Sequence, residues 1–313
     1  MAADSGGNNW QRGRLDEATF QLLARDLSGP ELQSALLGVL RQRAADRAPR
    51  EVLEQFRRDP FSASGLVDQR TSVAIDHELL AAASEFEAVE LSPLAPLGTT
   101  SSVALTDQNR VVSALRSTEV VSDPTNVLAL QSALRLRAAP GQAVHYATSH
   151  RVVRAQPVRS SPHHSQHFRL FVLTSAGREQ KDHGFTLQAL RQQVGAVLAG
   201  LNRLERAGYA FGARRIEVLT TPERASLGDR LAAASGLPSR RSPLDHAYYS
   251  GGLRYKIWLT TAQGVELPVV DGGAFDWVAK LTSNRRTVFV ATGLGSQLLP
   301  LLFRPTTVPS GGI

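Results

Sequence analysis

The first sixty residues carry apolar side chains at helical spacing and predict short helices. Asp16 precedes the first such segment and can cap it, because a short acidic side chain accepts hydrogen bonds from the free N–H groups of a helix start. Pro30 and Pro49 each stand at the start of a further segment, a position where proline is favoured. We therefore predict a helical extension over residues 1–60.

Hydrophobic patterning in the rest of the chain combines helices with several strands. Apolar residues over 67–86, including Val73 and Leu79, recur at helical spacing and predict a helix with one buried side. A second apolar stripe predicts a long helix over 187–204. Alternating or β-branched runs predict strands over 168–172, 216–218, 253–260 and 287–292. Because the strands cluster instead of alternating regularly with helices, we predict an α+β fold with a mostly antiparallel sheet flanked by helices.

Composition narrows the class of protein. The tail over 304–313 is rich in Pro, Thr, Ser and Gly and predicts a flexible end, which leaves 61–303 as the core. The 313 residues include no cysteine, which excludes a disulfide scaffold and cysteine chemistry. The polar N-terminus and the lack of an apolar run of about 20 residues predict a soluble, cytoplasmic protein without membrane contact.

Arginine supplies most of the positive charge. The net charge is +7, and 32 of the 35 basic residues are arginines. Drift of composition in a GC-rich genome explains such a bias, whereas the planar guanidinium also suits phosphate and carboxylate ligands. Several of the arginines lie in the N-terminal extension, so binding of RNA is a third interpretation of the arginine excess.

Common catalytic and metal-binding motifs are missing. The sequence has no phosphate-binding Walker loop, no dinucleotide fingerprint, no serine nucleophile elbow and no zinc-protease motif. His163, His164 and His167 lie close together, but no neighbouring acidic residue completes a ligand set. We therefore predict no metal site.

Three segments in the first half of the core form a series. The helix over 67–86 leads into an extended stretch that ends at Pro93, and residues 120–125 then bring an acid, Asp123, and a hydroxyl, Thr125, two positions apart. A hairpin follows, with polar residues on both arms: Arg151, Arg154, Gln156, Arg159 and, on the return strand, Arg169. Such a hairpin can offer fixed arginines to a phosphate group.

Further segments continue the series. Tyr248 and Tyr249 precede the predicted strand over 253–260. A glycine-rich turn follows over 271–276, and a β-branched strand with two glycines occupies 288–299.

Read in this order, the segments resemble the catalytic core of histidyl-tRNA synthetase, a class II aminoacyl-tRNA synthetase, and its paralogue, the regulatory subunit of ATP phosphoribosyltransferase. The resemblance covers residues 66–303 and implies a class II synthetase-like core with an N-terminal helical extension. It implies a homodimer formed through residues 67–94. It also implies ligand-binding residues (Asp123, Thr125, Gln156, Tyr248 and Tyr249) and phosphate- or ATP-binding residues (Arg151, Arg154, Arg159 and Arg169).

Several positions depart from the family pattern. Val121, Val153, Leu244 and Ala247 replace an arginine, a glutamate, the catalytic arginine and an aspartate. Ser296, Gln297 and Leu298 occupy the place of the arginine that holds ATP in the third motif. A short gap in the alignment would instead bring Arg240 or Arg241 to the place of the catalytic arginine. The sequence ends soon after this motif, so we expect no anticodon-binding domain.

These departures favour a non-catalytic paralogue, because adenylate formation depends on preorganised cations. Such a chain would bind an amino acid or nucleotide as a regulatory subunit in histidine biosynthesis, with a short ATP phosphoribosyltransferase catalytic subunit as its partner. We therefore assign no catalytic residue. Two alternatives stay open: an amino-acid-activating or amide-forming enzyme that uses ATP with Mg²⁺, and an RNA-binding module.

Overall fold

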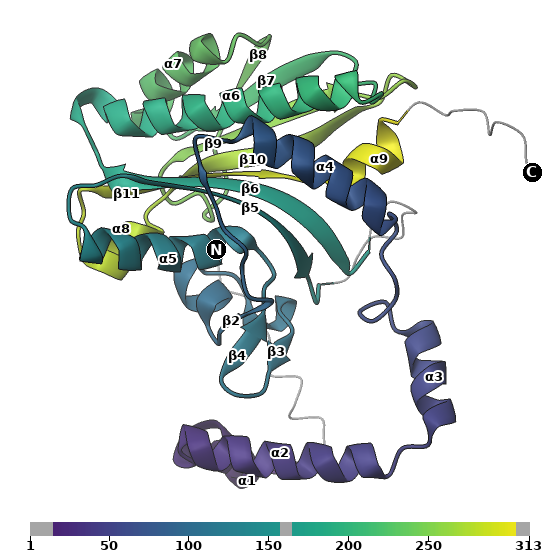
Figure 1. The fold of residues 1–313 in the computed structure, drawn as a ribbon. Helices are drawn as coiled ribbons and strands as arrows, with labels where there is room; N and C mark the ends of the chain where they lie inside the picture. Colours follow the sequence, from purple (N-terminus) through teal and green to yellow (C-terminus); the bar gives the residue numbers. More distant parts are fainter. Residues whose placement is uncertain (1–14, 157–164, 305–313) are drawn as a thin grey trace, which may run out of the picture.

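An eight-stranded sheet forms the centre of residues 15–156 and 165–304, the part of the chain that the computed structural model describes (Figure 1). Its inner pairs are antiparallel, and only the outermost strands, β1 and β8, pair in parallel with their neighbours. The strands in sheet order are β1 (Glu87–Ala88), β5 (Val144–Val153), β6 (His167–Arg178), β11 (Thr287–Leu294), β10 (Glu266–Phe275), β9 (Leu253–Thr260), β7 (Arg214–Thr220) and β8 (Ser239–Pro243). This confirms the predicted α+β fold with a mostly antiparallel sheet.

Helices α4 (Gln69–Ala82), α6 (Gly184–Arg206), α7 (Ala225–Ser235) and α9 (Leu298–Leu302) pack on one face of the sheet (Figure 1). The predicted stripe of α6 is confirmed at its centre and end, since Leu190, Leu201 and Leu204 are at most 1% exposed. The prediction for Val73 of α4 is wrong. Its side chain is 57% exposed, because Ser72, Ile75 and Leu79 form the buried side of that helix.

The other face of the sheet is covered only in part. Helices α5 (Pro124–Ala138) and α8 (Trp277–Thr282) pack on it, and an aromatic group that includes Phe275, Trp277 and Phe289 fills the space beneath them. Beyond the start of α5 neither helix covers this face, and a cavity lies there.

A small three-stranded sheet lies beside the start of α5. Its strands are β2 (Leu94–Pro96), β4 (Thr118–Val120) and β3 (Ser113–Ala114), with the helical turns η3 (Thr99–Val103) and η4 (Gln108–Arg110) between them. Glu119 of β4 is 1% exposed and accepts hydrogen bonds from Gly98 N–H, from Thr100 N–H and hydroxyl, and from the Gln108 side chain. One buried carboxylate therefore holds together the loops of residues 94–120, which we call the lid.

Residues 15–61 form an arm that extends from the core (Figure 1). Its elements are α1 (Glu17–Gln21), η2 (Leu22–Asp26), α2 (Gly29–Ala45) and α3 (Pro49–Arg58). The predicted cap at Asp16 and the helix starts at Pro30 and Pro49 are confirmed. No residue of these elements is buried. Where the chain reaches the core, His167 Nε2 lies 2.7 Å from the Ala63 carbonyl.

Two short turns complete the described elements, η5 (Lys181–His183) and η6 (Pro222–Arg224). Among the helices of the described ranges, none is both long enough and apolar enough to span a bilayer. The predicted tail lies outside the described residues apart from Arg304.

Candidate functional site

A cavity of about 840 Å³ lies on the partly covered face of the sheet. It is bounded by the lid, the start of α5, the loop before β9 and the floor strands β6, β9, β10 and β11. Most of the residues that the sequence resemblance assigns to ligand or ATP binding line this cavity: Asp123, Thr125, Arg154, Gln156, Arg169, Tyr248 and Tyr249. A cavity of this size accommodates a small organic ligand.

The Asp123 carboxylate stands at the start of α5. It accepts a hydrogen bond of 2.9 Å from Thr125 N–H and one of 3.1 Å from the Tyr248 hydroxyl. Asn126 is 2% exposed and also lines the cavity, and its Oδ1 has no hydrogen-bond partner among the described residues. This wall therefore presents two kinds of acceptor oxygen, one of them charged.

Two adjacent tyrosines connect this wall to the floor. The rings of Tyr248 and Tyr249 meet edge to face with centroids 5.3 Å apart. Tyr249 donates a hydrogen bond of 2.5 Å to Asp271 of β10, whereas Tyr248 donates to Asp123. Burial, and then the nearby carboxylates, raise the pKa of both hydroxyls well above the usual value, so both stay protonated donors.

Arg254 of β9 supplies a cation at the floor. Its Nε donates to Asp271 Oδ1 at 2.9 Å, its Nη2 donates to Asp271 Oδ2, and its guanidinium lies 4.7 Å from the centre of the Tyr249 ring. Burial lowers the pKa of Arg254, but the hydrogen bonds and charge of Asp271 outweigh this effect and raise it. Arg254 therefore carries its full charge inside the cavity.

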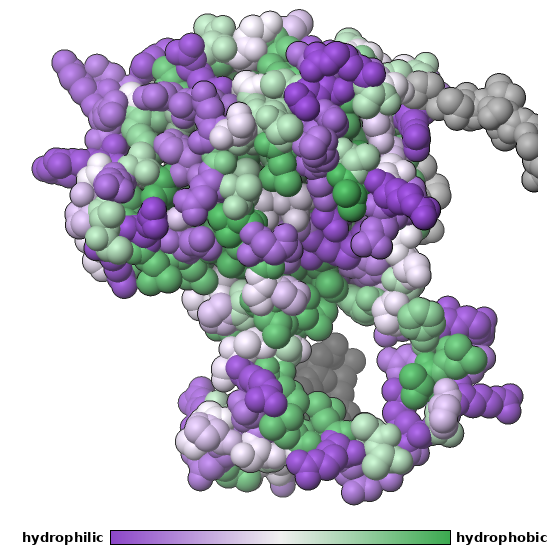
Figure 2. Space-filling model, in the orientation of Figure 1, coloured by the Kyte–Doolittle hydropathy of each residue, from purple (hydrophilic) through white to green (hydrophobic). Residues whose placement is uncertain are grey.

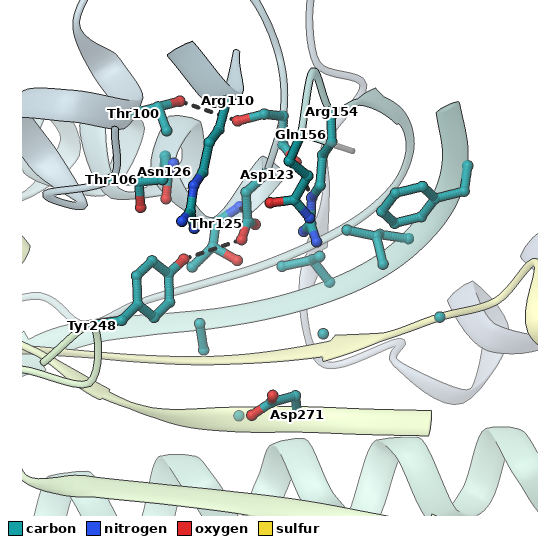
Figure 3. A pocket seen from close by; sticks show the side chains of 18 of the residues that line it. Thr100, Thr106, Arg110, Asp123, Thr125, Asn126, Arg154, Gln156, Tyr248 and Asp271 are labelled. Carbon is teal, nitrogen blue, oxygen red and sulfur yellow. Dashed lines mark hydrogen bonds between the residues drawn. The ribbon is translucent and has the colours of Figure 1, made fainter. Parts of the chain in front are cut away.

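Two more arginines flank Asp123. Figure 3 shows the Asp123 carboxylate between the side chains of Arg110 and Arg154. Arg154 donates to the Ser122 carbonyl at 3.1 Å, and its guanidinium lies 5.0 Å from the centre of the Phe168 ring. Neither arginine forms an ion pair with Asp123 in the described part of the chain. Both charges can therefore face a ligand.

The structure separates the arginines of the hairpin. Arg151 does not line the cavity, because alternation along β5 turns it to the opposite face, where its Nη1 lies 2.9 Å from His167 Nδ1. Arg169, its partner in register, borders the cavity, but its Nη1 is held by Asp76 of α4 at 2.5 Å. Arg159 lies outside the described residues. Arg151 therefore does not lie where the resemblance predicts that it binds a phosphate.

Neither candidate for a recruited arginine reaches the cavity. Arg241 lies on the edge strand β8 and donates to Asp229 of α7 at 2.8 Å. Arg240 is also on β8, beside Glu217 in register. Leu244 packs with the apolar residues around α5 and α8. The hypothesis that a gap recruits Arg240 or Arg241 is therefore wrong.

Sequence reasoning missed several polar residues of the cavity, among them Arg110, Asn126, Arg254 and Asp271. A signal existed for Arg254, because the buried residues of β9 are the odd-numbered ones, so that the even-numbered Arg254 lies on the opposite face. No signal existed for Arg110, which comes from an irregular turn of the lid.

No group of three acidic, histidine or cysteine side chains in the described ranges could hold a metal ion. His167 instead contacts Arg151 and the Ala63 carbonyl. His163 and His164 lie outside the described residues.

Comparison with known proteins gives a match in three dimensions only. No family model matches the sequence, and no curated protein matches it. An ATP phosphoribosyltransferase regulatory subunit/histidyl-tRNA synthetase from Bacillus halodurans matches with a TM-score of 0.57 and 12% identity, covering 77% of this chain and 81% of that one. The chain has a class II aminoacyl-tRNA synthetase fold.

Two further structures agree with this assignment. A histidine–tRNA ligase subunit from Alicyclobacillus acidocaldarius matches with a TM-score of 0.58 and 14% identity, covering 77% of this chain and 95% of that one. The apo histidyl-tRNA synthetase of S. aureus matches with a TM-score of 0.56 and 10% identity, covering 76% of this chain and 68% of that one. At such identities the likeness establishes the class II fold and leaves activity to the residues of the site.

Proposed function

We propose that this class II fold binds an amino acid in its cavity and acts as a regulatory subunit without activating that ligand. The observation that carries the proposal is the Asp123 carboxylate, held at the cavity wall by Thr125 N–H and the Tyr248 hydroxyl. Two donors occupy only part of its acceptor capacity, and Asn126 Oδ1 adds an unpartnered acceptor. An ammonium group is the complement of such a wall. Arg110 and Arg154, on either side of Asp123, suit the adjacent carboxylate of an amino acid.

Two of the arginines that the resemblance assigns to ATP are not placed to hold its α-phosphate. Adenylate formation places charge on the α-phosphate, and positioned cations normally stabilise that charge. Arg151 contacts His167 and does not line the cavity, and Arg169 is already paired with Asp76. Gln297 and Leu298 line the cavity where the resemblance has an arginine. We therefore derive no chemical step through ATP.

A regulatory role requires a partner. The Bacillus halodurans structure is described as a regulatory subunit of ATP phosphoribosyltransferase, and this supports a phosphoribosyltransferase of that kind as the partner. We propose that two copies of this chain associate through residues 67–94. That segment exposes Val73 of α4, an apolar side chain that association would cover.

RNA binding receives no support from the arm. Residues 15–61 hold seven arginines and eight acidic residues, so the arm is nearly neutral. Arg57 and Arg58 also pair with Glu54. Binding of RNA normally depends on an excess of positive charge.

Ligand screening tests the proposal. At least one of the twenty amino acids should raise the melting temperature of the wild-type protein, because a ligand that binds only the folded state stabilises it. Asp123→Asn removes the charge but keeps a good helix cap. This variant should melt like the wild type without ligand and bind at least tenfold more weakly. Unchanged affinity in the variant, or amino-acid-dependent pyrophosphate exchange by the wild type, contradicts the proposal.

A further inference from the structure

We propose that Arg254 is a second anion-binding residue of the cavity, so that the ligand carries one ammonium group and two oxyanions. The ligand class is therefore an acidic amino acid or a phosphorylated one. The inference rests on the proposed function for the ammonium group but adds a charge at a different place.

Arg254 is not required by packing. Strand β9 buries Leu253, Tyr255 and Ile257 completely on its other face, and these residues hold the strand against the core. The side chain of Arg254 is 18% exposed and opens into the cavity. A partly buried ion pair contributes little to stability compared with apolar residues of the same size. An apolar residue could therefore serve the fold equally well here.

Three contacts hold the guanidinium in place. Asp271 accepts from Nε and Nη2, and the centre of the Tyr249 ring lies 4.7 Å from the guanidinium. The Tyr249 hydroxyl also donates to Asp271 Oδ1, the oxygen that accepts from Arg254 Nε. No second carboxylate pairs with Arg254 in the described part of the chain. Its Nη1 edge is therefore the part that can donate to a ligand. A guanidinium that is already ordered loses little entropy when it binds an oxyanion.

The tyrosine pair connects the amino-acid wall to this cation along one side of the cavity. Tyr248 contacts Asp123, Tyr249 contacts Asp271, and the two rings contact each other. The ammonium and α-carboxylate of an amino acid would occupy the side of Asp123, Arg110 and Arg154. The end of the ligand's side chain, at the floor of the cavity, then faces Arg254. A carboxylate or a phosphate at the end of a side chain is the chemistry that Arg254 recognises.

The chain offers a matched control for this arginine. Arg215 of β7 donates to Glu266 through Nε and Nη2 and lies 4.4 Å from the centre of the Trp258 ring. It therefore repeats the arrangement of an arginine, a carboxylate and an aromatic ring, but it is not among the residues that line the cavity. Loss of a generic ion pair should affect both sites alike, whereas loss of ligand recognition should follow Arg254 alone.

Calorimetry with matched probes tests the inference. L-glutamate is compared with L-glutamine, and O-phosphoserine with serine, because each pair differs in one oxyanion. In the wild type, the acidic member of at least one pair should bind at least tenfold more tightly than its neutral counterpart. A preference for glutamate would identify a carboxylate as the second anion, and a preference for O-phosphoserine would identify a phosphate. Arg254→Gln should erase the preference, Arg254→Lys should restore part of it, and Arg215→Gln should keep it. Equal binding within both pairs, or a preference that survives Arg254→Gln, overturns the inference.

A second readout is independent of the ammonium wall. Titration of the wild type with inorganic phosphate or acetate should shift the NMR resonance of the Arg254 Nε–H group, and Asp123→Asn should retain this shift. If amino acids do not bind but the shift occurs, the proposed function fails and the anion site stands. If neither anion moves the resonance, the anion site fails, whatever the amino acids do. This readout also decides the question if Arg254→Gln does not fold.

Discussion

The two faces of the central sheet are built from the same strands but held by different forces. The face under α4 and α6 is packed with apolar side chains, among them Leu190, Leu201 and Ile257, which are fully buried. The cavity face carries Asp123, Asp271 and Arg254, each of which is hydrogen-bonded to a residue of another element.

This difference separates stability from recognition. Apolar burial is non-directional and stabilises the fold in proportion to area, so the packed face tolerates little loss of volume. Hydrogen-bonded charges contribute less net stability but set the place of each donor and acceptor. We therefore expect that residues of the cavity face can be substituted without unfolding the protein. Figure 2 shows polar and apolar residues intermixed on the outer surface of the core.

The largest expected effect comes from the packed face. Leu190→Ala should lower the free energy of unfolding by about 2–5 kcal/mol, because it leaves a cavity between α6 and the sheet. Leu134→Ala is the control, since Leu134 is 67% exposed on α5 and should change stability by less than about 0.5 kcal/mol. Urea denaturation measures both. Similar losses in the two variants would contradict the division between the faces.

The substitution Glu119→Gln should lower the free energy of unfolding by about 1–3 kcal/mol. The NH₂ group of the new glutamine would face an N–H donor of Gly98 or Thr100 instead of accepting a hydrogen bond from it. Burial raises the pKa of Glu119, but hydrogen bonds from Thr100, Gln108 and Gly98 outweigh it and lower the pKa below 4.5. A lowered pKa means that this contribution is complete above pH 4.5 and is lost as the pH falls through the folded value.

The difference in unfolding free energy between wild type and Glu119→Gln should therefore be constant above pH 4.5 and shrink below it. Urea denaturation across this range checks the sign. A difference that grows on acidification would contradict the role of the charged carboxylate in the lid.

Gly293→Val should weaken amino-acid binding at least tenfold, about 1.4 kcal/mol, with little change in melting temperature. A Cβ atom at Gly293 would face the cavity and meet only the Asp271 backbone oxygen, at 3.7 Å. The added methyl groups of valine then occupy ligand space. Gly293→Ala is the matched control and should retain most of the affinity. Calorimetry that finds wild-type affinity for the valine variant would place the ligand elsewhere.

The smallest expected effect comes from the arm, which belongs to neither face. Removal of residues 1–58 should change the melting temperature of the core by less than about 2 °C, because no residue in the described elements of this segment is buried. Removal of residues 1–66 also takes away the contact between Ala63 and His167 and should lower the temperature further. A large drop with the shorter truncation would mean that the arm packs on the core.

Much of the fold followed from local patterns. The stripe of α6, the helix starts at Pro30 and Pro49 and the alternation of β9 all depend on residues close in sequence. The small sheet of the lid was not predicted, because its strands have only two or three residues and are held together by Glu119.

The sequence by itself determined the main helices and strands of the core. It also identified Asp123, Thr125 and Tyr248 of the cavity wall, because Asp123 and Thr125 lie two positions apart and Tyr248 stands in a recognisable segment. Only the tertiary structure decided which arginines share the cavity. Alternation predicts that Arg151 and Arg154 point to opposite sides of a strand, but it does not tell which side holds the cavity. The pair of Arg254 and Asp271 joins two strands across 17 positions, a contact that depends on sheet register and leaves no local pattern.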